Sequence, residues 1–212
     1  MTRPTPQTSN RYQLYLVTDD QQDLATPMHV VAEAVKGGVT MVQLREKHGD
    51  IRAFIERANA LKAILAGTGI PLIINDRVDV ALAVDADGVH LGQSDMPAAL
   101  ARQLIGPDKI LGLSIESPQQ LAESQQLDLD YIGLSAIFAT PTKTNTSMHW
   151  GLDGLVDTLQ KTALPVVAIG GINQGNIREV AATGVHGIAL VSAICHADDP
   201  CLAARGIVEA MG

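Results

Sequence analysis

The residues of this sequence that are best suited to chemistry are charged or polar, and they follow short apolar runs. The first group is the segment Gln43-Leu-Arg-Glu-Lys47. In an extended segment successive side chains alternate, so Gln43, Arg45 and Lys47 point to one side. A planar guanidinium and a compact ammonium together suit a diphosphate, and the Gln43 amide suits a heteroaromatic ring. Taken alone, the segment fits a strand end with solvated charges equally well.

Two aspartates, Asp76 and Asp95, follow the next two apolar runs, at 71–74 and 88–91. A pair of carboxylates plus substrate phosphates is the usual way in which proteins hold Mg²⁺. Each aspartate alone is more typical of a helix cap. Their joint placement beside the basic pair favours a metal site.

Hydroxyl groups and glycines follow the later runs. Ser114 either binds a substrate or caps the next turn. The connection 139–147 is long and carries Lys143 among threonines, which is typical of a phosphate-binding lid; a loop with no role is the alternative. Gly171 and Ser192 follow the last two runs, where backbone N–H groups can approach an anion. The sequence therefore predicts two separate anion sites and two phosphorylated small-molecule substrates.

Eight apolar runs alternate with amphipathic segments, and these elements must position the polar residues. The runs are predicted as strands at 12–17, 40–44, 71–74, 88–91, 110–113, 131–134, 165–169 and 187–191. Helices are predicted at 27–36, 50–66, 78–84, 97–104, from 117 onward, and at 152–160, 173–182 and 200–211. Continuous apolar strands fit a parallel sheet buried on both faces. We therefore predict an α/β fold, a (β/α)8 TIM barrel whose functional groups lie at the carboxyl ends of the strands, with an open doubly wound sheet as the alternative.

Length and composition fit a single compact domain. The chain has 212 residues, of which 46% are hydrophobic, and no composition shift marks a boundary. We expect a catalytic barrel over 11–212 and a flexible tail over 1–10, which lacks the apolar core of a secretory signal.

The net charge of −8 argues against nucleic acid and anionic membranes as partners, and no run is long enough to span a bilayer. Cys195 and Cys201 are expected as reduced thiols of a cytoplasmic protein. Both a monomer and a homo-oligomer fit the sequence.

Taken together and in this order, these segments resemble the thiamine-phosphate synthase family over nearly the whole chain. The matching segments are Gln43-Leu-Arg-Glu-Lys47, Asn75-Asp76, His90-Leu-Gly-Gln-Ser-Asp95, Thr140-Pro-Thr-Lys143, Gly170-Gly-Ile172 and Val191-Ser192. Pro141 stands at a position that varies in the family, as does the stretch that follows Lys143.

The resemblance implies an enzyme that joins a hydroxymethylpyrimidine diphosphate to a thiazole phosphate, with or without a carboxylate on the thiazole, and releases diphosphate with the help of Mg²⁺. It implies that the pyrimidine diphosphate is bound by Gln43, Leu44, Arg45, Glu46, Lys47, Asn75, Ser114 and Lys143. The metal ligands would be Asp76 and Asp95. The thiazole phosphate would be bound by Thr140, Pro141, Thr142, Gly171, Val191 and Ser192. Catalytic roles would fall to Arg45, Lys47, Ser114 and Lys143.

The implied reaction is dissociative, so it needs no side-chain nucleophile, and no nucleophile–base motif is recognisable in the sequence. Two alternatives share the barrel and the thiazole-phosphate site: a thiazole tautomerase and a non-catalytic sensor. Neither needs the basic pair at Arg45 and Lys47 or the two aspartates. A third alternative is an unrelated phosphate-handling barrel, such as an isomerase. The glycine loops fit it too, but the Gln43–Lys47 and Thr140–Lys143 segments argue against it.

Overall fold

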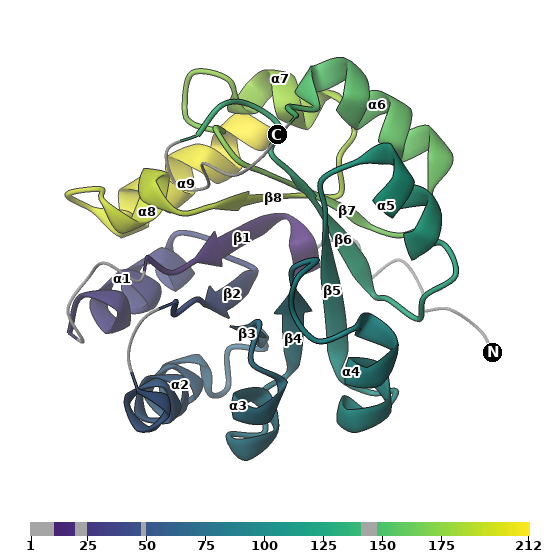
Figure 1. Ribbon diagram of the computed structural model, residues 1–212. Helices are drawn as coiled ribbons and strands as arrows, with labels where there is room; N and C mark the ends of the chain where they lie inside the picture. Colours follow the sequence, from purple (N-terminus) through teal and green to yellow (C-terminus); the bar gives the residue numbers. More distant parts are fainter. Residues whose placement is uncertain (1–10, 20–24, 48–49, 141–147) are drawn as a thin grey trace.

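The computed structural model describes residues 11–19, 25–47, 50–140 and 148–212. Within these ranges eight parallel strands close into a barrel, in which each strand pairs with the next along the chain and β8 pairs with β1 (Figure 1). The strands are β1 (Leu14–Val17), β2 (Met41–Leu44), β3 (Leu72–Asn75), β4 (Gly88–Leu91), β5 (Ile110–Ile115), β6 (Tyr131–Ser135), β7 (Val166–Ile169) and β8 (Gly187–Leu190). The predicted TIM barrel is confirmed, and the open sheet is excluded.

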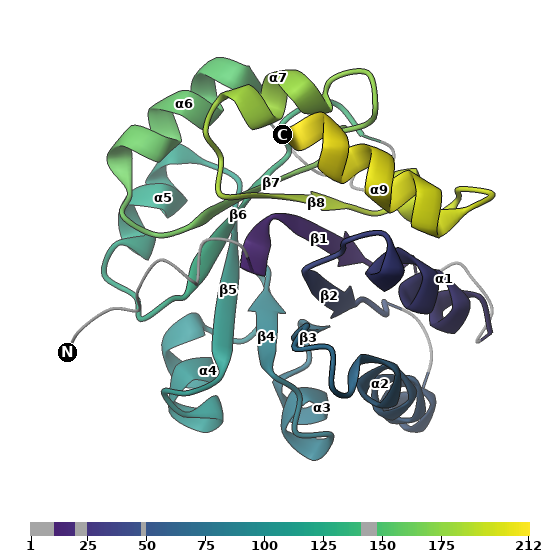
Figure 2. The ribbon, with the colours of Figure 1, turned by 180° about the vertical axis from the view of Figure 1, so that it is seen from behind.

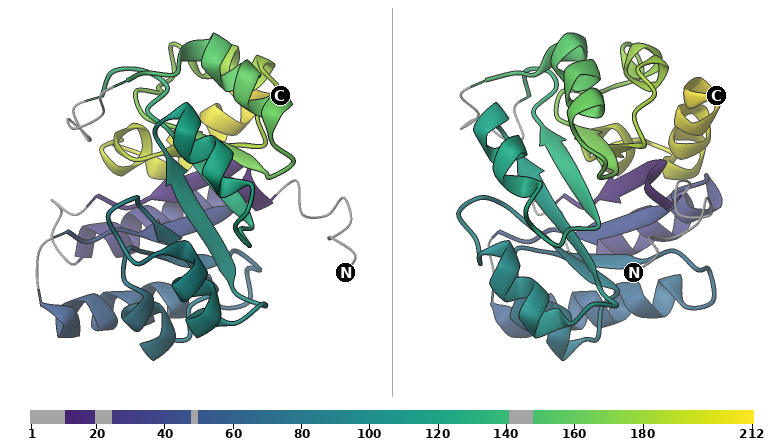
Figure 3. Two further views of the ribbon diagram at one scale, coloured as in Figure 1. Left: turned by 45° about the vertical axis from the view of Figure 1, so that its right-hand side comes forward. Right: turned by 90° about the vertical axis from the view of Figure 1, so that its right-hand side faces the viewer.

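Helices cover the outside of the barrel (Figures 1 and 2). They are α1 (Ala25–Lys36), α2 (Ile51–Leu65), α3 (Val78–Ala83), α4 (Ala98–Ile105), α5 (Pro118–Ser124), α6 (Gly151–Lys161), α7 (Ile177–Ala182), α8 (Ser192–Cys195) and α9 (Pro200–Met211). The last helix, α9, packs beside α1 and so closes the ring. Side views show the helices running along the outside of the strands (Figure 3). Every helix in the described ranges is too short or too polar to span a bilayer.

Alternate residues of each strand face either the barrel interior or the helices. In β1, Leu14 and Leu16 belong to the core between strands and helices, whereas Tyr15 and Val17 belong to a second core inside the barrel. Both sets are apolar and buried. This is why each strand reads in the sequence as a continuous apolar run rather than an alternating one.

Side-chain caps fix two of the predicted helix starts. Asp50 Oδ1 accepts a hydrogen bond from the backbone N of Ala53 at 2.9 Å, and α2 begins at the next residue. Ser117 Oγ accepts from the backbone N of Gln120 at 3.3 Å before α5, whose first residue is a proline. Both patterns are typical of helix N-termini.

The sequence misplaced the start of α7 and did not predict α8. The helix predicted from residue 173 begins only at Ile177, because Asn173 Oδ1 accepts from Gly175 N at 2.8 Å and Asn176 Oδ1 accepts from Asn173 N at 2.8 Å. Asparagine side chains that bind nearby backbone groups favour turns over helices. The short helix α8 was not predicted at all, because four residues are too few to show a periodic pattern.

Candidate active site

Strand register brings polar residues from four neighbouring strands to one end of the barrel. Asn75 of β3 pairs with His90 of β4, and His90 pairs with Gly112 of β5. Ser114 lies two residues beyond Gly112, and Gln43 of β2 pairs with a residue of the interior core. Paired residues of a parallel ladder share a face, so all these positions face inward. The structure therefore brings together three predicted site residues and adds His90 to them.

Backbone hydrogen bonds hold the end of β2 against β1. The backbone N of Thr18 donates to the carbonyl of Gln43 at 2.9 Å, and the backbone N of Arg45 donates to Thr18 Oγ1 at 3.0 Å. Leu44 points into the core between strands and helices, so it offers the site only its backbone. Thr18 was not anticipated, because a single threonine after an apolar run carries no distinctive signal.

Asp76 sits at the centre of the charged part of the site. Its φ of +62° lies in the left-handed region, where aspartate and asparagine are among the more tolerated residues. Its carboxylate forms an ion pair with the ammonium of Lys47, and the Asp95 carboxyl lies nearby. Burial, and then the Asp95 carboxyl, raise the pKa of Asp76, and the nearby Lys47 only partly opposes this. Of the predicted basic pair, Lys47 therefore meets Asp76.

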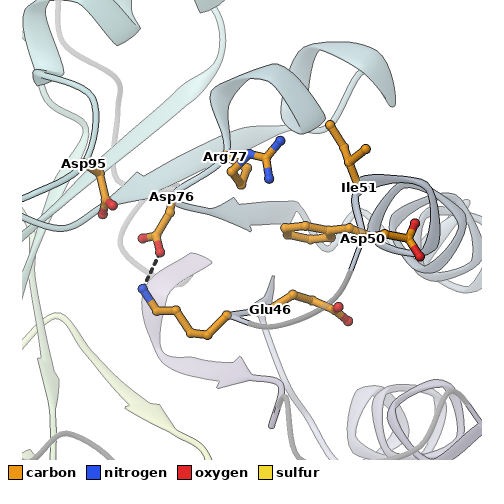
Figure 4. Close-up of a pocket in the computed structure, with 8 residues that line it drawn as sticks. Glu46, Asp50, Ile51, Asp76, Arg77 and Asp95 are labelled. Carbon is orange, nitrogen blue, oxygen red and sulfur yellow. Dashed lines mark hydrogen bonds and ion pairs between the residues drawn. The ribbon is translucent and has the colours of Figure 1, made fainter.

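A cavity of about 240 Å³ opens beside these groups, and Figure 4 shows Asp76, Asp95 and Arg77 around it. Asp95 Oδ2 accepts from the backbone N of Gly92 at 2.7 Å, which closes a turn after β4. Neither aspartate caps a helix: α3 starts after Arg77 without a side-chain cap, and α4 starts after Pro97. The helix-cap alternative is thereby excluded for both residues.

The donor set fits a magnesium ion. Asp76 and Asp95 line the same cavity, so their carboxylates form a hard, anionic oxygen site. Burial, and then the neighbouring Asp95 carboxyl, raise the pKa of Asp76. Mg²⁺ is usually held by one or two carboxylates together with substrate phosphates, so a third protein ligand is not required. Within the described residues, no group of three or more His, Cys, Asp or Glu side chains is arranged around a common metal position.

Glu46 turns away from these groups. Its carboxylate forms an ion pair with Arg57 of α2, and the two side chains are only 7% and 19% exposed. Arg57 Nε is buried and, among the described residues, has no hydrogen-bond partner. The pair fixes the segment next to Lys47 against α2, and it places the Glu46 carboxylate in a structural contact.

Asn75 carries an unsatisfied donor. The residue is 7% exposed, and within the described part of the chain its Nδ2 has no hydrogen-bond partner. Leaving a buried amide unpaired costs free energy. A buried donor of this kind beside Asp76 is ready to meet an acceptor on a bound molecule.

Glycines shape the opposite side of the site. Gly171 has a φ of +68°, and a Cβ there would lie 2.6 Å from the carbonyl oxygen of Ala139, so only glycine fits. In the described part of the chain, the backbone N–H groups of Gly171 and Ser192 donate to no protein acceptor. Val191 and Ser192 lie where β8 leads into α8.

The loop after β6 is described only in part. Thr140 is half-buried and lies at the end of the described stretch. The predicted site residues Pro141, Thr142 and Lys143 lie outside the described residues.

A buried hydrogen-bond chain crosses the barrel interior, and sequence reasoning missed it. Gln43 Nε2 donates to the hydroxyl of Tyr15 at 2.7 Å, and the hydroxyls of Tyr15 and Tyr131 are 2.9 Å apart. His90 Nδ1 lies 2.8 Å from the hydroxyl of Tyr131, and His90 Nε2 lies 2.9 Å from Ser114 Oγ. Sequence reasoning assigned no role to Tyr15 or Tyr131, because both belong to apolar runs.

Comparison with known proteins decides the family. The family described as "Thiamine monophosphate synthase" matches residues 14–194. The chain belongs to the thiamine-phosphate synthase family. Among its relatives, thiamine-phosphate synthases of Vibrio parahaemolyticus serotype O3:K6 and Vibrio campbellii are 73% and 72% identical to it, each over 95% of this chain and 99% of the relative.

The fold comparison agrees with the sequence comparison. The solved thiamine phosphate pyrophosphorylase from Pyrococcus furiosus superposes with a TM-score of 0.88 at 38% identity, over 96% of this chain and 97% of that one. The chain is thus an enzyme of the thiamine-phosphate synthase family, a transferase of thiamine biosynthesis built on a TIM barrel. The predicted resemblance and enzyme class are confirmed.

Proposed function

We propose that this synthase joins a hydroxymethylpyrimidine diphosphate to a thiazole phosphate and forms thiamine phosphate and diphosphate with the help of Mg²⁺. The observation that carries the proposal is the meeting of Lys47, Asp76 and Asp95 beside one cavity. A cation and two carboxylates at that point suit a diphosphate bound together with a divalent metal. A thiazole tautomerase or a sensor would have no use for them.

The diphosphate site would be formed by Arg45, Lys47 and Lys143. The metal would be held by Asp76 and Asp95, and when bound it would neutralise charge on the leaving diphosphate. Arg45 follows β2, and Lys47 lies against Asp76, so both cations belong to the same end of the barrel. The Glu46 side chain would act indirectly, through its pair with Arg57.

The thiazole phosphate site would lie across the barrel, at the backbone amides of Gly171 and Ser192. Loops after strands seven and eight bind phosphate in many TIM barrels. The backbone N–H groups of Gly171 and Ser192, which donate to no acceptor among the described residues, suit an anion, and the residue Ser192 is exposed. The Val191 backbone would join them at the phosphate, and Thr140, Pro141 and Thr142 would contact the thiazole substrate.

The chain's own residues would bind and orient the two substrates and would exclude water from the site. The C–O bond to the diphosphate breaks first, and its electron pair leaves with the diphosphate. The thiazole nitrogen then donates its lone pair to the resulting carbocation, so no proton transfer is needed. Gln43, Asn75 and Ser114 would hold the pyrimidine, and the segment that carries Lys143 would keep water from the cation.

Purified protein mixed with both substrates tests the proposal, with thiamine phosphate followed as thiochrome fluorescence. We expect product with Mg²⁺ and a loss of product when the metal is chelated. Absence of product with both substrates and metal present would refute the synthase activity, and conversion of the thiazole phosphate alone would instead identify a tautomerase.

We also propose a cytoplasmic location. Neither Cys195 nor Cys201 forms a disulfide in the structure, as expected of a protein in a reducing compartment. Separation of intact cells into cytoplasmic and envelope fractions, followed by immunoblotting, tests this.

A further inference from the structure

The buried hydrogen-bond chain links two of the proposed pyrimidine-binding residues through three side chains without an assigned role. Gln43 stands at one end and Ser114 at the other, with Tyr15, Tyr131 and His90 between them. Tyr15 and Tyr131 are 1% and 0% exposed, and His90 is 9% exposed. A buried hydroxyl group must donate its proton in a hydrogen bond to an acceptor within the protein.

The orientation of the Gln43 amide, whose Nε2 faces Tyr15, sets the direction of the hydrogen-bond chain. Tyr15 accepts from Gln43 Nε2, so its own proton has one acceptor within the described residues, the hydroxyl oxygen of Tyr131. Tyr131 must then donate to His90 Nδ1. Burial raises the pKa of Tyr15 and of Tyr131, so both keep the proton that this direction requires.

The tautomer of His90 follows from this direction. A neutral imidazole whose Nδ1 accepts carries its proton on Nε2 and donates it to Ser114 Oγ, 2.9 Å away. The hydroxyl proton of Ser114 is then left for a bound molecule. At the other end the Gln43 amide, whose nitrogen is committed to Tyr15, is left with its carbonyl oxygen as acceptor.

We infer that Tyr131 and His90 are positioning residues that make Ser114 a donor and Gln43 an acceptor, and so select an aminopyrimidine over the corresponding oxopyrimidine. An aminopyrimidine edge offers an amino donor and a ring-nitrogen acceptor, whereas the oxo ring reverses this pattern. The inference deepens the proposed function and rests on it. Reversal of the hydrogen-bond chain would require the Gln43 amide to flip. Ser114 would then become an acceptor and Gln43 a donor towards the bound pyrimidine at the same time.

The interior is shaped around these side chains. The rings of His90 and Tyr131 stack with centroids 5.4 Å apart. A Cβ at Gly133 would lie 3.1 Å from His90 Cε1, and one at Gly112 would lie 2.2 Å from Tyr131 Cζ. Glycines in the two adjoining strands thus leave room for the rings and hold them in place.

Histidine ¹⁵N NMR on the unmodified protein tests the tautomer directly. We expect His90 to carry its proton on Nε2, with the His90 signal assigned by replacing the other five histidines one at a time. A His90 that carries its proton on Nδ1 would overturn the inference. This readout does not depend on turnover, so it is separate from any failure of the proposed synthase activity.

A pair of variants tests the selectivity. Tyr131→Phe removes the donor to His90 Nδ1, and we expect the preference in kcat/KM for the amino over the oxo substrate to fall about tenfold. Tyr12→Phe is the matched control: its ring packs 5.1 Å from that of Tyr131, but its hydroxyl donates to the carbonyl of Asp130 and is outside the chain. Equal preferences in Tyr131→Phe and the parent protein, or an equal loss in Tyr12→Phe, would contradict the inference.

Discussion

Gly112 lies against the phenol ring of Tyr131 on the neighbouring strand, with which it is paired in register. A Cβ at residue 112 would lie 2.2 to 2.5 Å from three atoms of that side chain. The ring is fully buried and hydrogen-bonded at its hydroxyl, so it has no room to withdraw. The glycine is therefore required by packing, although its backbone φ is ordinary.

We predict that Gly112→Ala lowers the free energy of unfolding by about 2 kcal/mol or more, because overpacking displaces a buried ring. Chemical denaturation measures this. Gly206→Ala is the control: Gly206 lies inside α9 with no atom within 4 Å of an added Cβ, and alanine there should raise stability by about 1 kcal/mol. Equal stabilities of the two variants would contradict the packing argument.

Asp76 is predicted to reduce the stability of the free enzyme. Its pKa is raised in the folded state, so folding favours the protonated form, and the ionised carboxylate costs stability once the pH exceeds the ordinary aspartate value near 4. Asp76→Asn should therefore raise the free energy of unfolding at pH 7 in metal-free buffer. Thermal unfolding measures this.

The effect of Asp76→Asn should vanish as the pH falls below about 4, where the parent carboxyl is protonated in both states. Asparagine also tolerates the left-handed backbone at this position, whereas Asp76→Ala should be less stable than Asp76→Asn. Clear destabilisation by Asp76→Asn at pH 7 would mean that the pair with Lys47 outweighs burial and repulsion.

The two cysteines should differ in reactivity. Burial raises the pKa of the Cys195 thiol to about 12, so almost none of it is thiolate at pH 8. Cys201 is partly exposed on α9. We predict that a thiol reagent modifies one group in the native protein and both after unfolding. The native signal should disappear in Cys201→Ser and persist in Cys195→Ser; the opposite pattern would refute this assignment.

Lys143 is predicted to act on the leaving diphosphate. Lys143→Ala should lower kcat at least tenfold while the dissociation constant of the pyrimidine diphosphate changes less, because charge on the leaving group develops mainly in the transition state. Pre-steady-state turnover and equilibrium titration separate the two effects. Lys161→Ala, which removes an exposed cation paired with Asp157 on α6, is the control. An unchanged kcat in Lys143→Ala would show that Lys143 does not act on the leaving diphosphate.

Much of the fold could be predicted because local patterns decide it. Apolar runs, the cap at Asp50 and the cap and proline at Ser117 are readable within a few residues. The start of α7 was misplaced because the turn made by Asn173 and Asn176 competes with the helix pattern. Polar residues at the strand ends were identifiable because a barrel gathers them at one end.

The interior chain was not predictable in this way. Tyr15 and Tyr131 are 116 residues apart, and His90 and Tyr131 are 41 apart. No local period links them, and each residue alone reads as part of an apolar run or as a structural histidine. Only strand register, which determines the residues that face one another across the barrel, reveals the contact. The same holds for Glu46, which the sequence grouped with Lys47 but which the structure pairs with Arg57.

We propose above all that Asp76 and Asp95 together hold the metal that activates the diphosphate. The most direct test is single-turnover formation of thiamine phosphate, measured against Mg²⁺ concentration, in the parent protein, Asp76→Asn and Asp95→Asn. We predict that each variant loses at least about 100-fold in rate at saturating substrate, and that far-ultraviolet circular dichroism is unchanged. A parent-like rate and Mg²⁺ dependence in either variant would show that the substituted aspartate is not a metal ligand.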